Sequence, residues 1–338
     1  MRLAAALALA ISAAAPASSA SADVRIEYDR YAQAAQLVDI GGRKLNLRCE
    51  GEDRGGPTIL LESGLAFSSI GWRDTQPLLA RLAPTCAYDR AGLGFSDPGP
   101  MPRDAAALAR DLEALVDAAD LKPPFVLIGN SMGSQPLRLF AFDRPDAVAG
   151  LILLDPYVEG SLATLSAIDP ALAKEGEALR AQDEACITAY RAGVLTQVLA
   201  ESKGCIGTPP PRTSPRVQSV LQGQRMSRTG FETAYAETMA FERSNDAIIA
   251  RETRSLGALP LIILSAQNNH SEDKYAATRA ALLSAQYGLH GRLAALSSLG
   301  EVRWVDASHV VQTSNPQVVA ETVAEMLQTL TATQGISE

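Results

Sequence analysis

A serine that could act as a nucleophile lies in the segment Gly129-Asn130-Ser131-Met132-Gly133, between an apolar run at residues 125–128 and a predicted helix at 134–142. In such a strand–turn–helix connection the serine occupies a sharp, strained turn, so glycine is needed two positions before and after it. The turn would expose the hydroxyl of Ser131 and place the N–H of Met132 at a helix N-terminus, facing a developing oxyanion. The pattern predicts a nucleophilic serine, with an ordinary glycine-bounded turn as the alternative.

A serine hydroxyl needs a general base before it can attack a carbonyl carbon. The chain has three histidines, at positions 270, 290 and 309. His309 follows a predicted strand at 301–305 by a short turn and precedes the last predicted helix, and it is a candidate for the base. We expect His290, within a predicted helix, to be a surface or otherwise satisfied residue. His270 follows another predicted strand and could line the cleft without taking part in the reaction.

The acid that would orient the imidazole has two candidate positions. Asp155 ends the apolar run 148–154, at the sheet edge where open α/β sheets place their sites, although a structural aspartate would fit the same pattern. Glu272 and Asp273 follow the next predicted strand, where helix capping would explain them equally well. We favour Asp155 and keep Asp273 as the alternative.

The composition argues against several classes of function. With 338 residues and 47% hydrophobic content, the chain can form one large core and has room for a second lobe. The net charge is −8 and no block of basic residues occurs, so neither nucleic acid nor an anionic membrane surface is an expected partner. The histidines are far apart and no Cys-x-x-Cys occurs, so we expect neither a metal site nor a cofactor.

The N-terminus has the pattern of a secretory signal peptide, with Met1-Arg2, an apolar run over residues 3–15 and small residues up to Ala22. The apolar run is too short to span a bilayer, and the first cysteine, Cys49, lies far beyond a lipid-attachment position. We therefore expect cleavage near residue 22, export to a periplasm or the medium, and no stable membrane anchor.

Export changes how the four cysteines are interpreted. In an oxidising compartment an even number of cysteines suggests two disulfides, and four cysteines allow three pairings. Four buried thiols, which behave as small hydrophobic groups, are the alternative.

The hydrophobic pattern predicts a parallel sheet interrupted by a long helical segment. The predicted strands are residues 36–40, 44–50, 58–62, 85–88, 125–128, 148–154, 259–265 and 301–305, and the first two flank Gly41-Gly42 as a hairpin. The predicted helices are residues 72–82, 104–119, 134–142 and one that begins at Asn315-Pro316, where Asn315 caps the first turn. All-apolar strands alternating with helices indicate a parallel sheet covered on both faces. Residues 157–257 instead change to polar, alanine-rich helical segments.

Several motifs together make the chain resemble the α/β-hydrolase superfamily, specifically its exported branch with a helical lid. They are Leu60-Leu61-Glu62-Ser63-Gly64-Leu65, Tyr88-Asp89-Arg90-Ala91-Gly92-Leu93-Gly94-Phe95-Ser96-Asp97, the Gly129–Gly133 segment, Gly150–Pro156 and Ser308-His309. They span about residues 35–330 in the order of the family. The resemblance implies a mostly parallel eight-stranded sheet with helices on both faces, a core of residues 23–156 and 258–338, and a lid of residues 157–257.

The resemblance also implies roles at the site. Relatives place the base where this chain has His309, and some place the acid at the position of Asp155, whereas the more usual loop, residues 266–270, has no carboxylate here. The second oxyanion donor would be the N–H of Leu65, opposite Met132.

Further implications of the resemblance concern residues around the site. In this fold the second and fourth strands are neighbours, which favours a Cys49–Cys86 disulfide and leaves Cys186–Cys205 within the lid. Asp89 and Arg90 are expected to tie their loop structurally to the nucleophile turn. Two positions depart from the family: most relatives have histidine in place of Ser63 and of Asn130. Both departures could alter substrate preference.

The sequence thus predicts an exported serine hydrolase that cleaves a small-molecule carboxylic ester through an acyl-enzyme. Serine at position 131 argues against the dehalogenase and epoxide-hydrolase members that the chain also resembles, because those use aspartate there. An amide or peptide hydrolase, such as a lidded aminopeptidase, and a non-catalytic binding relative are the alternatives. The sequence does not specify the acyl chain, the alcohol or the oligomeric state.

Overall fold

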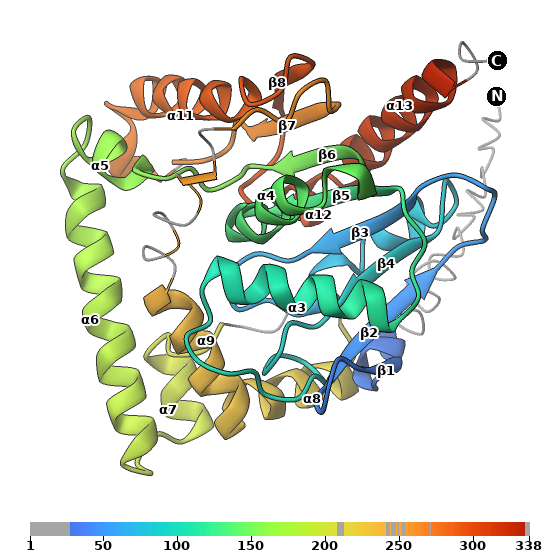
Figure 1. The fold of residues 1–338 in the computed structure, drawn as a ribbon. Helices are drawn as coiled ribbons and strands as arrows, with labels where there is room; N and C mark the ends of the chain where they lie inside the picture. Colours follow the sequence, from blue (N-terminus) through green and yellow to red (C-terminus); the bar gives the residue numbers. More distant parts are fainter. Residues whose placement is uncertain are drawn as a thin grey trace, which may run out of the picture.

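The computed structural model describes residues 28–334 apart from 208–212, 241–243, 245–247, 249, 252–253 and 271. An eight-stranded sheet runs through the molecule in the order β1-β2-β4-β3-β5-β6-β7-β8 (Figure 1). The strands are β1 (Gln36–Asp39), β2 (Lys44–Glu50), β3 (Thr58–Glu62), β4 (Thr85–Tyr88), β5 (Phe125–Asn130), β6 (Val148–Leu154), β7 (Leu261–Ala266) and β8 (Gly300–Val305). β2 pairs antiparallel with β1 and β4, and the other pairs are parallel. The predicted fold is confirmed, whereas the predicted signal peptide, residues 1–22, lies outside the described residues.

The central strands are mostly apolar because both faces of the sheet are covered. Successive side chains of a strand point to opposite faces. Val126 and Ile128 of β5 therefore join the core on one face, and Leu127 joins the core on the other. Every residue of β5 and of β7 is buried.

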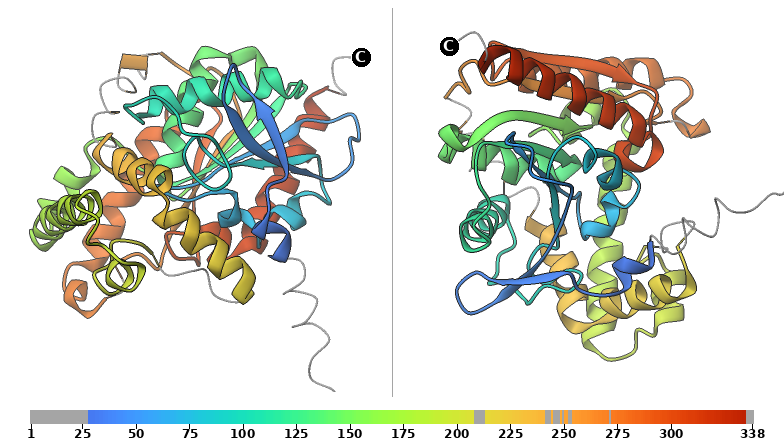
Figure 2. Two further views of the ribbon diagram at one scale, coloured as in Figure 1. Left: turned by 90° about the horizontal axis from the view of Figure 1, so that it is seen from below. Right: turned by 90° about the vertical axis from the view of Figure 1, so that its right-hand side faces the viewer.

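Two layers of helices cover the sheet, as Figure 2 shows from two further sides. One face packs against α3 (Ala105–Ala118), α4 (Ser134–Asp143) and α11 (Arg279–Ala294), and the other against α2 (Gln76–Leu79), α12 (Val311–Ser314) and α13 (Pro316–Gln334). Short 3-10 turns are η1 (Arg30–Ala32), η2 (Ser69–Trp72), η3 (Ser131–Gly133), η4 (Pro145–Ala147) and η5 (Asp273–Tyr275). The predicted cap of the last helix is present, since Asn315 Oδ1 accepts from the N–H of Val318 at 3.2 Å.

The predicted helix at residues 72–82 is wrong in extent. The structure has the 3-10 turn η2, a break, and then the four-residue helix α2. Pro77 lies in the first turn of α2, where its missing N–H is tolerated. In a helix that began at Trp72, the ring of Pro77 would clash with the preceding turn, so the longer helix does not form.

The helices that the structure describes between β6 and β7 form an insert, called the helical insert below. They are α5 (Ser161–Ser166), α6 (Ala171–Arg191), α7 (Gln197–Ser202), α8 (Pro215–Met226) and α9 (Arg228–Ala240). The long helix α6 runs along one side of the molecule, at the left of Figure 1. The insert has a small core of its own around Ile187, Ala200 and Phe231. The Cys186–Cys205 disulfide joins α6 to the end of the α7 segment in this core.

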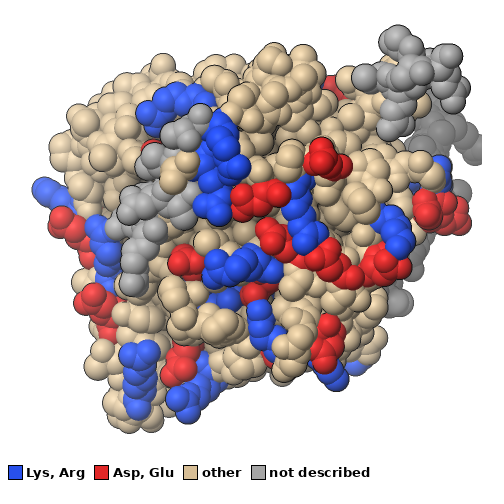
Figure 3. Space-filling view, in the orientation of Figure 1, with Lys and Arg blue, Asp and Glu red and all other residues tan. Residues whose placement is uncertain are grey.

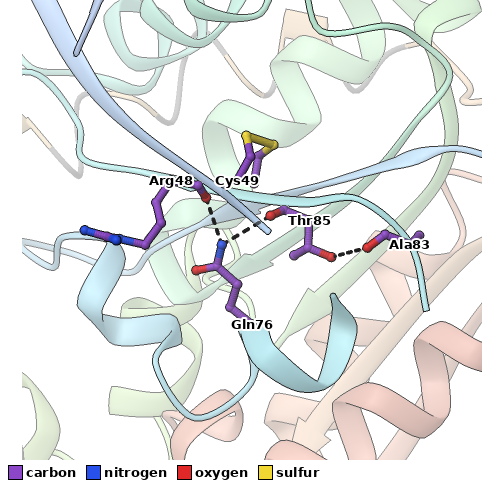
Figure 4. The surroundings of a disulfide bond; sticks show 6 residues. Arg48, Cys49, Gln76, Ala83 and Thr85 are labelled. Atoms are coloured by element: carbon purple, nitrogen blue, oxygen red, sulfur yellow. Dashed lines mark hydrogen bonds between the residues drawn. A yellow bond between two sulfur atoms is a disulfide. The ribbon is translucent and has the colours of Figure 1, made fainter. Parts of the chain in front are cut away.

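The other disulfide, Cys49–Cys86, joins two residues that are direct partners in the antiparallel pair of β2 and β4. Beside it, the amide of Gln76 donates to the carbonyls of Arg48 at 2.8 Å and Thr85 at 3.2 Å (Figure 4). Both predicted disulfides are therefore present.

The surface carries charges of both signs. Acidic and basic side chains alternate across the face shown in Figure 3, and exposed pairs such as Arg144–Asp117, at 2.6 Å, join neighbouring elements. Among the residues that the structure describes, no helix has the length and apolar character required to cross a bilayer.

Candidate active site

Ser131 follows β5 and begins the turn that leads into α4. Its φ angle is 53°, in the left-handed region that a residue with a side chain rarely adopts. The flanking glycines make this turn possible. A Cβ at Gly129 would lie 2.8 Å from the Leu137 side chain, and a Cβ at Gly133 would lie 2.6 Å from the carbonyl oxygen of Ser63. The predicted glycine-bounded turn therefore has the strained geometry that presents the serine hydroxyl.

His309 links the serine to an aspartate through its two ring nitrogens. Nε2 lies 2.9 Å from the Oγ of Ser131, and Nδ1 lies 2.6 Å from Oδ2 of Asp155. The three side chains come from the segments after β8, β5 and β6, so the structure brings together three residues that are far apart in the sequence. The predicted hydrogen bond between Asp155 and His309 is present, and Asp273, the alternative acid, is not this partner.

Asp155 is buried, with 2% of its surface exposed, and its carboxylate accepts three further hydrogen bonds. The donors are the N–H of Ala266 at 3.0 Å, the amide of Asn269 at 2.7 Å and the amide of Gln286 at 2.6 Å. Burial alone would raise the pKa of Asp155, but the hydrogen bond and charge of His309, together with Asn269, outweigh burial and lower it. Asp155 is therefore ionised at neutral pH.

Asn269 and Gln286 were missed by the sequence reasoning. Residues 266–270 have no carboxylate, but the N–H of Ala266, at the end of β7, and the amide of Asn269, in the loop after it, hold the carboxylate of Asp155. The polar pair Asn268-Asn269 directly after an apolar strand was the signal available. No local pattern marked Gln286, which comes from α11.

The ionised Asp155 determines the state of His309. A carboxylate can only accept, so Nδ1 of His309 carries a proton, and Nε2 is free to accept the hydroxyl proton of Ser131. Partial burial would lower the pKa of His309, but the hydrogen bond and charge of Asp155 raise it above the ordinary value. The side chain of His309 is 52% exposed, so a substrate can reach it.

Asn130, one of the two departures from the family pattern, holds the segment of His309 in place. Its amide donates to the carbonyls of His309 and Leu154, both at 2.9 Å. Its oxygen accepts from Gln312 at 3.3 Å. Asn130 therefore joins the strand before the nucleophile to the loop that carries the candidate base.

The two predicted oxyanion donors belong to segments that adjoin Ser131. Met132 is the next residue in the chain, and Leu65 lies in the segment after β3. A Cβ at Gly64 would lie 3.6 Å from the Cβ of Ser131, so the segment of Leu65 passes directly beside the serine. Leu65 and Met132 therefore stay the predicted oxyanion donors.

The sequence predicts that Asp89 and Arg90 tie their loop to the nucleophile turn. This prediction is wrong, because both side chains bind a different segment. Asp89 accepts from the N–H of Ser69 at 2.7 Å and from the amide of Asn46 at 2.9 Å. Arg90 donates to the carbonyl of Ser63 at 2.7 Å and also contacts the helical insert. Both side chains hold the segment after β3 rather than the turn after β5.

The remaining histidines differ from each other. His290 is buried and contacts the Oγ of Ser265 at 2.9 Å and the carbonyl of Pro156 at 3.1 Å, so it is a satisfied residue but not a surface one. Burial lowers its pKa. His270 lines the cavity described next, with its ring edge-on to Tyr275 at 5.4 Å between centroids, and burial lowers its pKa as well.

A cavity of about 610 Å³ opens at the serine and the histidine. Its walls come from the loops after β5, β6, β7 and β8 and from the insert helices α5 and α6. The lining residues are Ser131, Asp155, Pro156, Tyr157, Val158, Ser161, Leu165, Leu172, Glu175, Asn268, Asn269, His270, Glu272, Tyr275, Gln286, Leu289, His290, Ser308 and His309. A separate cavity of about 230 Å³ between the insert and residues 66–70 is lined by neither Ser131 nor His309, so we assign the chemistry to the larger cavity.

Among the described residues, no group of three or more His, Cys, Asp or Glu side chains is arranged to hold a metal ion.

Comparison with known proteins agrees with this geometry. Residues 59–322 match the model of the alpha/beta hydrolase family. The chain belongs to this family. The predicted superfamily is therefore confirmed by a match that includes the residues after β3, β5, β6 and β8.

Members and structural neighbours of the alpha/beta hydrolase family resemble the chain over different lengths. The uncharacterised protein YqjL of Bacillus subtilis (strain 168) is 36% identical over 104 residues, which are 30% of this chain and 40% of the relative. A 2-hydroxy-6-oxononadienedioate/2-hydroxy-6-oxononatrienedioate hydrolase of Paraburkholderia xenovorans (strain LB400) is 30% identical over 130 residues, 36% of this chain and 45% of the relative. The chain thus spans less than half the length of these curated relatives. A laboratory-evolved variant of potato epoxide hydrolase has the same fold, with a TM-score of 0.64 at 19% identity over 87% of this chain and 98% of that one.

Proposed function

We propose that the protein is an exported serine hydrolase that cleaves carboxylic esters through an acyl-enzyme. The observation that carries this proposal is the hydrogen-bonded series Ser131–His309–Asp155, with contacts of 2.9 and 2.6 Å, at the edge of a cavity. A serine in a strained turn, a histidine within reach of it and a buried carboxylate behind the histidine are the groups that nucleophilic acyl transfer requires.

In the proposed reaction, Nε2 of His309 takes the proton of Ser131 as the Oγ attacks the ester carbonyl carbon. The N–H groups of Leu65 and Met132 stabilise the negative oxygen of the tetrahedral intermediate. Collapse of the intermediate breaks the bond to the alcohol oxygen, which receives the proton from His309. His309 then takes a proton from a water molecule as this water attacks the acyl carbon. The bond between the acyl carbon and Oγ of Ser131 breaks, Oγ receives the proton from His309, and the carboxylic acid leaves. No step requires a metal ion or a cofactor.

Asp155 has a positioning and electrostatic role in this proposal. Its carboxylate holds the tautomer of His309 in which Nε2 can accept a proton, and it stabilises the imidazolium that forms. The raised pKa of His309 strengthens it as a base, and the lowered pKa of Asp155 keeps the carboxylate charged while the histidine changes state.

The cavity lining supports a neutral ester as the substrate. Leu165, Leu172 and Leu289 provide apolar wall, and the volume suits a small molecule. No lysine or arginine belongs to the described lining, whereas Glu272 does. The hydrolase from Paraburkholderia xenovorans has a dioate in its name, but the described lining residues of this cavity include no lysine or arginine that could pair with a substrate carboxylate.

An amide or peptide hydrolase of the aminopeptidase type remains the alternative. Recognition of a free amino group would need a carboxylate dedicated to it. Glu175 already pairs with Lys274 and with the hydroxyl of Tyr275, and Glu272 is exposed. We therefore place ester cleavage first.

The test is a hydrolysis series with p-nitrophenyl esters of increasing acyl length, run beside p-nitroanilide amides. We expect a burst of about one p-nitrophenolate per protein with the esters, followed by slower turnover, because an acyl-enzyme accumulates. Faster cleavage of the anilides would favour the amide alternative. Absence of product from every substrate would point to the non-catalytic binding relative.

We also propose that residues 1–22 direct export and that residues 157–257 act as a lid. Two disulfides support an oxidising compartment, and α5 and α6 support the lid because they line the cavity. N-terminal sequencing of the protein from a periplasmic fraction or the medium tests the export. A mature chain that begins at Met1 would contradict it.

A further inference from the structure

The segment that carries Leu65 is held by side chains rather than by regular secondary structure. We call residues 63–68 the oxyanion segment. Arg90 donates to the carbonyl oxygens of Ser63 at 2.7 Å and Gly64 at 2.8 Å. Glu237, from helix α9 of the insert, accepts from the N–H of Ala66 at 3.0 Å. These contacts come from a core loop and from the helical insert, which meet at this segment.

The contact with Gly64 determines the direction of the predicted oxyanion donor. The carbonyl of Gly64 and the N–H of Leu65 belong to one planar, trans peptide unit, so they point in opposite directions. Because Arg90 holds the carbonyl at 2.8 Å, it also fixes the N–H of Leu65. The N–H of the next peptide unit, at Ala66, is held by Glu237. The peptide units on both sides of Leu65 are therefore anchored.

The hydrogen bonds to the oxyanion segment hold a backbone conformation that is unfavourable by itself. Ala66 has a φ angle of 57°, in the left-handed region that is unfavourable for a residue with a Cβ. Such a conformation persists only where the surroundings hold it. The hydrogen bond from the N–H of Ala66 to Glu237 is a contact of this kind, and it reaches across to a residue of the insert.

Glu237 also holds the arginine that acts on Gly64. Its two carboxylate oxygens accept from Nε and Nη2 of Arg90 at 2.7 and 2.8 Å, which is a bidentate pair. Arg90 donates on its other side to Glu62 at 2.7 Å, and Glu62 accepts from Tyr88. Arg90, Glu62 and Glu237 are almost fully buried, so water does not screen these contacts. Within this network, Glu237 is the group contributed by the insert.

We propose that Glu237 is a positioning residue for the oxyanion segment, so that the helical insert completes the oxyanion site as well as covering the cavity. Glu237 acts through Ala66 and Arg90 and does not touch the reacting atoms. The proposal rests on the proposed function, since it requires that Leu65 donates to an oxyanion. It assigns to the insert a part in the chemical step, in addition to substrate selection.

The first test compares Glu237→Gln with wild type on p-nitrophenyl acetate, a substrate too small to depend on the lid for binding. Glutamine keeps the size of the side chain but cannot accept from Arg90 and Ala66 with both of its end atoms. We expect kcat to fall about 10- to 100-fold, approaching the loss caused by removal of one oxyanion donor, with KM within about twofold. Glu237→Ala should lose at least as much.

A matched control separates positioning from general stability. Asp111 of helix α3 forms a similarly buried ion pair, at 2.6 Å, with Arg103, which precedes the helix, and it also pairs with Arg43. Asp111→Asn should lower Tm, as the Glu237 variants should, while kcat stays within about twofold. If Glu237→Gln also kept kcat within twofold of wild type, the contact would be structural only and the proposal would be overturned.

Hydrogen–deuterium exchange distinguishes failure of this proposal from failure of the proposed function. In Glu237→Gln, peptides that cover residues 63–68 should exchange faster than in wild type and in Asp111→Asn, whether or not esters are cleaved. Faster exchange without ester turnover in the wild type would retain the anchoring but contradict the hydrolase. Unchanged exchange in a protein that cleaves esters would overturn the role of Glu237 alone.

Discussion

The parallel sheet and the helical insert are stabilised in different ways. Every residue of β5 is buried, and all but one residue of each neighbouring strand, β3 and β6, is buried as well. In α6, by contrast, Cys186 and Ile187 are the buried residues among 21. The insert depends on a few specific anchors, which include the Cys186–Cys205 disulfide, the stacked rings of Tyr190 and Phe231 at 4.3 Å and the ion pair of Glu237 with Arg90.

Because of this difference, the sheet can hold site residues in precise positions, whereas the insert can tolerate changes on its exposed faces. A densely packed sheet holds its loops within a narrow range of positions, which suits groups that must meet at hydrogen-bond distance. Ser131, Asp155 and His309 all follow strands of that sheet. Helices with few buried residues can change their exposed faces at little cost, which suits a wall that selects substrates. The comparison predicts that changes in the core affect chemistry and that changes in the insert affect stability and selectivity, with Glu237 as the exception.

The largest expected effect tests whether the chemistry belongs to the core. Ser131→Ala should reduce kcat for p-nitrophenyl acetate by about 10⁵- to 10⁶-fold, because it removes the nucleophile, while Tm changes little. Ser134→Ala, a nearby serine on α4, is the control and should keep near wild-type turnover. Steady-state kinetics and calorimetry on both variants make the measurement. A Ser131→Ala protein with near wild-type turnover would exclude the proposed mechanism.

The next effect separates the two candidate acids. Asp155→Asn should lower kcat by about 10³- to 10⁴-fold, because the amide favours the wrong tautomer of His309 while the geometry is nearly kept. Asp273→Asn should have little effect, since Asp155 is the partner of the histidine. Kinetics of both variants on one activated ester decide the assignment. A greater loss in Asp273→Asn would move the acid to the loop after β7.

The third prediction compares how much each of the two disulfides contributes to the free energy of unfolding, one in the sheet and one in the insert. The cysteines are 37 residues apart in the sheet and 19 apart in the insert. Loop-closure entropy therefore predicts a loss of about 4 kcal/mol for Cys49→Ala/Cys86→Ala and about 3 kcal/mol for Cys186→Ala/Cys205→Ala. Urea unfolding followed by circular dichroism measures both.

The insert pair should also leave chemistry largely intact. We expect Cys186→Ala/Cys205→Ala to keep kcat for p-nitrophenyl acetate within about tenfold, because Ser131, His309 and Asp155 do not contact that disulfide. A larger loss of kcat in a variant that is fully folded would show that residues of the insert other than Glu237 also affect the chemical step.

The smallest expected effect is on the pH dependence of kcat/KM. The base must be unprotonated, and Asp155 raises the pKa of His309 above its ordinary value of 6.5. The value of kcat/KM should therefore fall as pH decreases, with a midpoint above 6.5 in the wild type. In Asp155→Asn the carboxylate is absent, so the midpoint should move to lower pH. A pH–rate profile from pH 5 to 9 tests both, and a midpoint that does not move would contradict the electrostatic role of Asp155.

Much of the fold could be predicted because it depends on local patterns. All eight predicted strands are present within about two residues at their ends, since an all-apolar run between turn residues leaves few other structures open. The nucleophile turn was equally predictable, because it needs glycine at fixed spacing. The predicted helix at residues 72–82 is wrong for a local reason as well, since Pro77 is compatible only with the first turn of a helix.

Local patterns in the sequence predict the strands and the strained turn at Ser131, because each follows from residue types within a few positions of one another. The resemblance to the family adds His309 as the candidate base. Only the tertiary structure decided which acid meets His309, since Asp155 and the histidine are 154 positions apart and meet where two strands end. The same holds for the contact between Ala66 and Glu237, which are separated by 171 positions. Such contacts depend on how the insert docks onto the sheet. That docking is determined by packing over many residues, so no local pattern reveals it.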